Sequence, residues 1–302
     1  LHMFRGLLYG SYQKPKELVW VFGCTIYLAM MAEGFLGYVL PYGQMSYWGA
    51  QVIISLFGAI PYIGESLELW IRGDYYISGI TISRFFALHV VALPLVLIAL
   101  VFLHLVALHE VGAGNPEGVD IEAHLDDDGV PLDSVPFFPY KVLNALVGIG
   151  VFMTVFSVIM FFFPEGGGYF IEMANFQEAN PLVTPEHIAP VWYYAPFYTM
   201  LRAVPDPLGG LIVMGSAVAI FFVVPWLDRS KVASIRYKGL YSKIALTMFG
   251  VSFITLGYLG TVGVTEIRKT MSVICTVIYF AYFLLMPIYT KFETTKEVPQ
   301  RL

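Results

Sequence analysis

The stretch Phe85–Leu108, FFALHVVALPLVLIALVFLHLVAL, contains two histidines, His89 and His104, and no Asp, Glu, Lys or Arg. A bilayer core about 30 Å thick is crossed by roughly 20 apolar helical residues. The stretch is therefore long and apolar enough to form a membrane-spanning helix. Ionisable or metal-binding side chains are costly inside such a helix and usually mark a functional site. The two histidines are therefore the first candidate functional residues.

Five further apolar stretches have the length of a membrane span, and among them Glu33 is the single charged residue. They are Leu18–Leu40, Val142–Phe163, Leu208–Leu227, Ile244–Thr265 and Thr270–Thr290. Of the 302 residues, 58% are hydrophobic and 13% are charged, against about 25% charged residues in a soluble domain. The mean hydropathy is +0.71. These values exclude a water-soluble globular enzyme, and they predict an all-α integral membrane protein with six transmembrane helices.

Two long connections, Pro41–Arg84 and Pro164–Pro207, lie on the same side of the predicted bundle. Both are rich in Trp, Tyr, Phe, Ile and Pro, which is not typical of solvated loops. We expect amphipathic helices in both connections, lying in the membrane interface. Together these helices would wall a pocket for an apolar ligand.

The basic residues outside the spans fall mainly in three segments that share the opposite side of the bundle. These segments precede the first span, follow the fourth and follow the sixth, and they contain Arg5, Lys14, Lys16, Arg229, Lys231, Arg236, Lys238, Lys243, Lys291, Lys296 and Arg301. The positive-inside rule makes this side cytoplasmic, with both ends of the chain on it. The Glu110–Tyr140 loop falls on the same side although it has eight acidic and no basic residues. A net charge of −5 argues against a nucleic-acid partner.

His89 and His104 are spaced so that each could bind a separate haem. Fifteen residues correspond to about 1,500° of helix rotation and some 22 Å of rise, so both side chains lie within roughly 60° of one face. A neutral imidazole is a good axial ligand for haem iron. The pair therefore predicts two haems, one near each side of the membrane. The alternative is two core histidines that hydrogen-bond between helices.

Two glycines of the first span have a matching spacing. Gly23 and Gly37 are 14 residues apart and lie about 40° from a common face. Glycines at this rise would let two flat macrocycles approach the backbone, although small residues also serve helix packing in membranes. His2 is the candidate second ligand beside His104, while His89 has no such partner. The chain opens with Leu-His-Met-Phe-Arg, which is neither an initiator start nor a signal peptide. This opening and the missing partner of His89 lead us to expect a fragment.

Six motifs resemble cytochrome b of the cytochrome bc complex, and the resemblance covers essentially the whole chain. They are GYVLPYGQMSYWGA (37–50), AIPYIG (59–64), SRFFALH (83–89), HLVALHEVG (104–112), PLVTPEHIAPVWY (181–193) and PWLDRS (225–230). That family has eight spans, so we expect this sequence to lack the first span and nearly all of the second.

The resemblance implies a role for individual residues. His2 and His104 match the ligands of the high-potential haem, with Arg5 near its propionates, and His89 matches a ligand of the low-potential haem. The remaining haem-binding assignments are Gly23, Gly37 and Arg84. The quinone-reduction site is matched by His109 and Lys141. The quinol-oxidation pocket is matched by Phe35, Tyr38, Met45, Gly49, Pro190, Trp192, Tyr193, Phe197 and Tyr198.

Two departures from the family remove proton-carrying groups. Val191 stands where the family usually has a glutamate in Pro-Glu-Trp-Tyr, and Val142 stands where it has an aspartate after the loop lysine. A replacement base at the oxidation pocket must reach the quinol hydroxyl directly or through one water. We expect Glu186 to serve, with Glu33 second and Tyr198 also catalytic. Desolvation would raise the pKa of such a carboxyl. The alternative for either glutamate is a structural hydrogen bond or ion pair.

The resemblance implies the cytochrome b subunit of a bacterial ubiquinol–cytochrome c reductase in the inner membrane. Residues 1–110 would then bind two b-type haems, 111–140 would form an acidic cytoplasmic loop, and 141–302 would form a four-span domain with the quinol-pocket loop 164–207. Implied partners are an iron–sulfur (Rieske) subunit, a cytochrome c-type subunit, a second copy of the complex and ubiquinone. The rival functions are a proton-coupled transporter with a histidine relay and a haem-containing membrane anchor for a soluble dehydrogenase.

Overall fold

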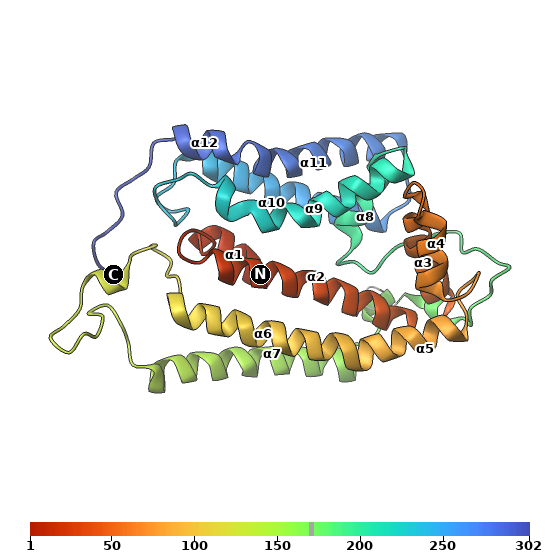
Figure 1. Cartoon of the computed structure of the whole chain (residues 1–302), viewed down its shortest axis with the longest axis horizontal. Coiled ribbons are helices and arrows are strands. Elements are labelled where there is room, and N and C mark those ends of the chain that lie inside the picture. The colour runs from red at the N-terminus through yellow and green to blue at the C-terminus, as the bar shows by residue number, and fades with distance from the viewer. Residues whose placement is uncertain (169–171) are drawn as a thin grey trace.

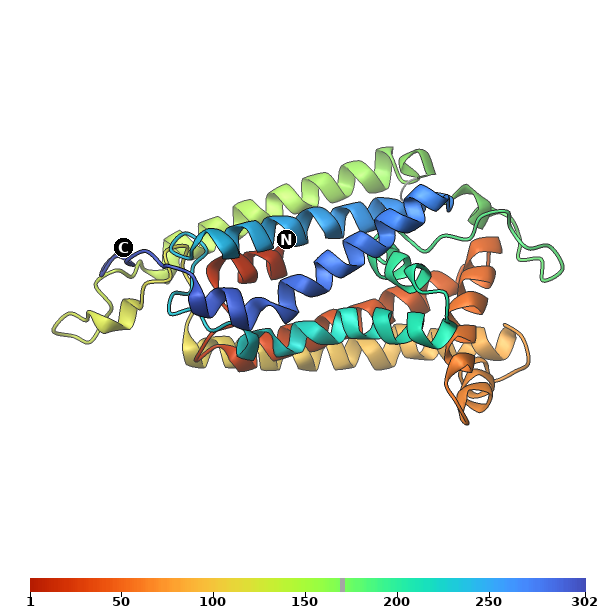
Figure 2. The same cartoon turned by 90° about the horizontal axis from the view of Figure 1, so that it is seen from above.

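The computed structural model describes residues 1–168 and 172–302, and within these ranges the regular structure is entirely helical. Six helices are long and apolar enough to cross a membrane, which confirms the six predicted spans. They are α2 (Glu17–Val39), α5 to α6 (Gly79–Val111), α7 with its preceding turn (Phe137–Phe162), α9 (Pro207–Leu227), α10 (Leu240–Thr261) and α11 (Glu266–Leu284). They run side by side along the long axis of the molecule (Figures 1 and 2).

Shorter helices cap the bundle, and both long connections contain them, as predicted. The short α-helices are α1 (His2–Tyr9), α3 (Gln44–Ser55), α4 (Gly64–Arg72), α8 (Ala195–Ala203) and α12 (Met286–Phe292). Within the second span, α5 is Gly79–Ala87 and α6 is Leu93–Val111. Single helical turns are η1 (Leu56–Ala59), η2 (Leu88–Ala92), η3 (Ile121–Ala123), η4 (Phe137–Lys141), η5 (Gly166–Gly168) and η6 (Met173–Phe176). Within the third span, α7 is Val142–Phe162. Figure 1 shows α3 and α4 together at one end of the bundle.

The last two spans begin and end earlier than the sequence predicted. The fifth ends at Thr261 because Thr265 instead caps the next helix, its hydroxyl accepting a hydrogen bond from the amide of Arg268 at 3.3 Å. Glu266 in the first turn of α11 is favoured by the positive end of the helix dipole. The sixth span then stops before Pro287, which opens α12 as a separate short helix.

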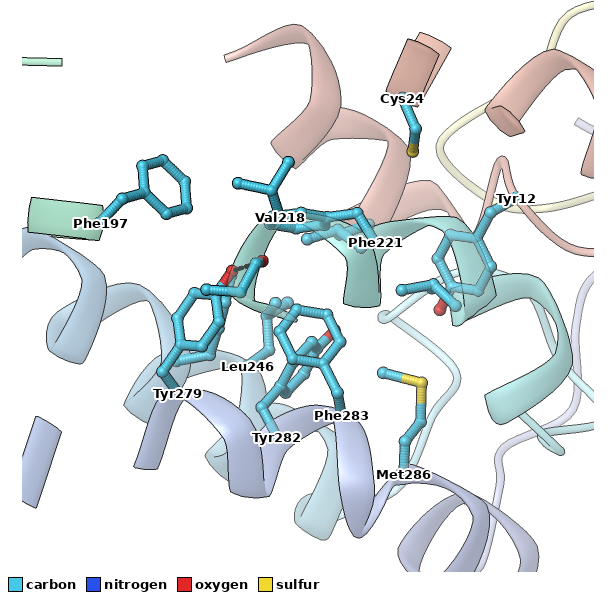
Figure 3. Packing of buried hydrophobic residues seen from close by; sticks show 14 of the residues in the cluster. Tyr12, Cys24, Phe197, Val218, Phe221, Leu246, Tyr279, Tyr282, Phe283 and Met286 are labelled. Atoms are coloured by element: carbon cyan, nitrogen blue, oxygen red, sulfur yellow. Dashed lines mark hydrogen bonds between the residues drawn. The ribbon is translucent and has the colours of Figure 1, made fainter. Parts of the chain in front are cut away.

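The largest buried core lies where α9, α10 and α11 meet (Figure 3). Phe249 stacks on Tyr282 with ring centroids 4.7 Å apart, and the Tyr279 hydroxyl donates to the carbonyl of Ala217 at 2.6 Å. α8 packs tightly on this core, because a Cβ on Gly260 would lie 2.4 Å from the carbonyl oxygen of Ala195. The core therefore fixes α8, which carries part of the candidate site.

A buried ion pair at the end of α9 holds the segment between α1 and α2. The Lys238 ammonium pairs with the Asp228 carboxylate, and both side chains are almost completely buried. Tyr12 and Gln13 donate to the same carboxylate oxygen at 2.7 and 2.9 Å. Burial alone would raise the pKa of Asp228, but Lys238, the Tyr12 hydroxyl and the backbone amide of Ser230 hold it below its usual value. The segment that joins α1 to α2 is thereby fastened to the α9–α10 loop.

The acidic loop lies at the same end of the bundle as the basic segments. Arg236 pairs with Glu117, and the Ser234 hydroxyl donates to the carbonyl of Pro116 at 2.6 Å. Arg301 of the C-terminal tail pairs with Asp133 at 3.1 Å. The acidic charges thus partly neutralise the basic segments that the loop contacts.

Replacing Asp228 with alanine should lower the thermal stability of the protein strongly. The change leaves the Lys238 ammonium buried without a counter-charge, which costs about 3–5 kcal/mol. Replacing Glu117 is the matched control, because its partner Arg236 is 60% exposed and an exposed pair is worth about 0–1 kcal/mol. Thermal unfolding in lipid nanodiscs measures both, and equal losses would contradict the structural role given to Asp228.

Candidate functional site

His89 lies in a wide helical turn whose cause is Pro94. A proline cannot donate to the carbonyl four residues earlier, and the helix widens to a π-type turn at Leu88–Ala92 just before it. The Nδ1 atom of His89 lies 3.0 Å from the main-chain carbonyl oxygen of Glu33. Because a carbonyl can only accept, Nδ1 carries the proton, and the lone pair of Nε2 is left to bind a metal.

Each glycine singled out in the first span faces one of the two histidines. A Cβ on Gly37 would lie 2.5 Å from the Cε1 atom of His89, so no larger residue fits there without displacing the imidazole. A Cβ on Gly23 would lie 3.4 Å from Cε1 of His104, which is the edge of ordinary contact. α2 and α6 therefore approach each other at two glycine–histidine contacts.

His2 and His104 have the separation expected of two ligands on one iron. The centre of an imidazole lies about 1.2 Å from its nitrogens, and a metal–imidazole bond is about 2 Å, so two rings that bind one metal from opposite directions have centres about 6.4 Å apart. The measured separation is 6.4 Å. The angle of 74° between the rings is compatible with this arrangement, because each ring can rotate about its metal bond.

The other residues predicted to bind haem differ in how well their surroundings suit it. The buried Nδ1 atom of His104 has no hydrogen-bond partner among residues 1–168 and 172–302. Arg5, predicted to lie near haem propionates, is exposed and stands over the ring of Tyr9 at 5.9 Å. Arg84 is directed elsewhere: its Nη1 donates to the carbonyl of Trp70 at 2.9 Å. The positions of the histidines and glycines thus agree with haem binding, whereas the side chain of Arg84 is hydrogen-bonded to the main chain at Trp70.

An apolar cavity of about 1250 Å³ opens beside the His89 end of the bundle. Its walls come from α2 to α5, from α8 and α9, and from the loop before α8. The sequence-predicted residues in the lining are Phe35, Gly49, Arg84, Pro190, Phe197 and Tyr198. A large apolar cavity with few polar groups is typical of a site for a hydrophobic ligand.

Four residues predicted for the pocket do not line this cavity. Met45 is fully buried in α3, and Tyr38 is partly buried in the last turn of α2. Trp192 and Tyr193 are 48% and 42% exposed. Tyr193 still lies close to α2, because a Cβ on Gly34 would be 3.3 Å from its hydroxyl.

The loop before α8 is held against the start of α3 by a set of hydrogen bonds. The Gln44 side chain donates to the carbonyl of Val183 at 2.6 Å and accepts from the amide of Asn180 at 2.7 Å. The amide of Ser46 donates to the Asn175 side chain at 2.8 Å. These bonds join the two long connections into one roof over the cavity end of the bundle.

The carboxylates near this roof differ in their surroundings. Glu186 is exposed, so it lacks the desolvated position expected for it. Glu172, which the sequence did not single out, is half-buried, and burial raises the pKa of its carboxyl while His187 partly offsets the change. Its charge also acts on Tyr38. No spacing or motif marks Glu172, because its burial depends on how the loop folds.

The predicted quinone-reduction residues lie at the other end of the bundle. His109 is exposed in the last turn of α6, five residues beyond His104. Lys141 is exposed where α7 begins.

Comparison with known proteins places these features in a family. Residues 1–196 match the family described as cytochrome b (N-terminal)/b6/petB, and residues 178–280 match cytochrome b (C-terminal)/b6/petD. The match does not favour the transporter alternative.

Individual relatives are similar over nearly the whole chain. Cytochrome b of Allochromatium vinosum is 54% identical, covering 100% of this chain and 75% of its own. Cytochrome b of Rhodospirillum rubrum is 44% identical, covering 99% and 71%. A solved structure titled "Hyperthermophilic respiratory Complex III" superposes with a TM-score of 0.88 at 33% identity, covering 97% of this chain and 74% of that one. The chain therefore belongs to the cytochrome b family of multi-pass, haem-containing oxidoreductase subunits.

Proposed function

We propose that the chain acts as the cytochrome b subunit of a respiratory complex III in a bacterial inner membrane. It would oxidise quinol at the cavity end of the bundle and reduce quinone at the basic end, coupled to proton translocation. The observation that carries this proposal is the separation of His2 and His104, which matches two ligands on one iron. The likeness to a complex III structure supports membership of a multisubunit assembly.

The histidines have distinct roles in this proposal. His2 and His104 would hold one b-type haem, and His89 would contribute its imidazole nitrogen to a second. Bound haems would supply one-electron transfer between the two faces of the membrane. Gly23 and Gly37 would keep α2 close to α6, and Arg5 would reach the propionates at the basic end.

The cavity would hold the quinol ring. Its wall contributes the aromatic rings of Phe35 and Phe197 and the hydroxyl of Tyr198, which lies 3.3 Å from the carbonyl of Ile188. Gly49 borders open space, since a Cβ there would meet nothing within 4 Å. Such a wall suits a flat ring with an apolar tail.

The partners and the membrane orientation follow from the two ends of the bundle. We propose that the exposed roof over the cavity receives an iron–sulfur subunit, which passes electrons to a cytochrome c-type subunit, and that the complex is a homodimer. The basic end, with the C-terminal tail and the acidic loop, would face the cytoplasm. His109 and Lys141 would bind ubiquinone there.

Replacing His104 with leucine should remove one of two haems. The change takes one axial nitrogen from the pair with His2, so the haem at the basic end should be lost. His109→Leu is the matched control, because its exposed side chain would contact quinone rather than iron; it should keep both haems and slow quinone reduction. Redox titration of visible absorption in membranes measures both variants. A His104 variant with two intact haem transitions would refute the proposal.

We propose Glu172 in place of Glu186 as the base that Val191 cannot provide, because Glu172 is half-buried and close enough for its charge to act on Tyr38 of α2, whereas Glu186 is exposed. A general base works only when it is deprotonated. The raised pKa of Glu172 moves the pH at which its carboxyl loses the proton towards neutral. Quinol oxidation should therefore accelerate as pH rises through this pKa. In Glu172→Gln the acceleration should disappear and the rate should fall by about a hundredfold.

Glu186→Gln provides the comparison, because the exposed side chain of Glu186 should matter little. Quinol oxidation by the assembled complex would be followed from pH 5 to 9 for both variants, with haem spectra as the check of integrity. The reverse result, a lost pH step in Glu186→Gln and an unchanged profile in Glu172→Gln, would reinstate Glu186.

A further inference from the structure

A buried carboxylate lies against the imidazole of His89. Glu33 lies in the C-terminal third of the spanning helix α2, six residues before its end at Val39, and its side chain is 17% exposed. Its Oε1 atom lies 3.0 Å from Nδ1 of His89. Its Oε2 atom is buried, without a hydrogen-bond partner in the described part of the chain. A charged side chain at this depth is costly and needs a physical reason.

The position of Glu33 directs this carboxylate at one histidine. Glu33 and Gly37 are four residues apart and therefore lie on the same face of α2, the face that contacts His89. The main-chain carbonyl of Glu33 already accepts from Nδ1 at 3.0 Å and is enough to fix the tautomer. The carboxylate adds a negative charge that the tautomer does not require.

A negative charge beside a metal-bound imidazole changes the reduction potential of the metal. It makes the imidazole a stronger electron donor, and in a low-dielectric interior its charge is poorly screened. Both effects stabilise the oxidised, more positive iron. We infer that Glu33 is a positioning residue that lowers the reduction potential of the haem bound by His89, an inference that rests on the function proposed above.

His104 provides the contrast within the same helix. Its Nδ1 atom is buried and finds no acceptor among the described residues, so its imidazole receives no such charge. The inference therefore requires an effect confined to one haem. A purely structural role for Glu33 in packing α2 against α6 would disturb both glycine–histidine contacts.

The test is a potentiometric titration of both haems in the assembled complex in membranes, comparing Glu33→Gln with the native protein. Glutamine keeps the size of the side chain and removes the charge. The reduction equilibrium of the His89 haem should shift about tenfold towards the reduced form, an increase of about 59 mV in its midpoint. The midpoint of the His104 haem should stay unchanged. Glu17→Gln, the other carboxylate of α2, is the matched control and should shift neither.

An unchanged midpoint of the His89 haem, or equal shifts of both haems, would overturn the inference while leaving two haems and the proposed function intact. If Glu33→Gln loses the His89 haem, Glu33→Asp decides: recovery of the haem with its low midpoint supports the inference, and failure to recover overturns it. Electron paramagnetic resonance of the oxidised His89 haem should change in the same variant that shifts the midpoint, because the imidazole of His89 becomes a weaker electron donor.

Discussion

The close approach of α2 to α6 at two glycine–histidine contacts is the constraint on which the rest of the structure depends. At one end Gly37 leaves room for the His89 ring, and at the other Gly23 faces His104. Because 14 residues of one helix and 15 of the other have nearly the same rise, the antiparallel pair stays in register over both contacts. Backbone groups inside a membrane must be satisfied within the helices, so polar chemistry there comes from side chains placed at such contacts.

The cavity follows from this pair and from the aromatic core on the other side. α9 passes between them, contributing Phe221 to the core and Met214 and Phe222 to the cavity wall. α8 cannot move towards the space, because Gly260 and Thr199 hold it against α10. The cavity is therefore the volume left where two rigid units meet under a hydrogen-bonded roof, and it lies next to His89.

Structural features that depend on composition and helical periodicity could be predicted from the sequence. Features that depend on how the loops fold could not. Six spans and helices in both long connections followed from apolar length and aromatic content. The ends of the last spans did not, because capping by Thr265 and the break at Pro287 compete with hydrophobicity. Glu186 looked suitable beside the Pro-Val-Trp-Tyr motif, yet it is exposed, whereas Glu172 is half-buried in the same connection. The burial of neither glutamate can be predicted from the spacing of residues in the sequence.

The two histidine environments also give the proposed electron path a direction. The Nδ1 atom of His89 faces a carbonyl and a carboxylate, while that of His104 faces no acceptor in the described structure. The more electron-rich ligand favours the oxidised metal, so the site beside the cavity should have the lower potential and the site at the basic end the higher one. Electrons move spontaneously from lower to higher potential. A quinol oxidised in the cavity would therefore deliver its electron towards the basic end.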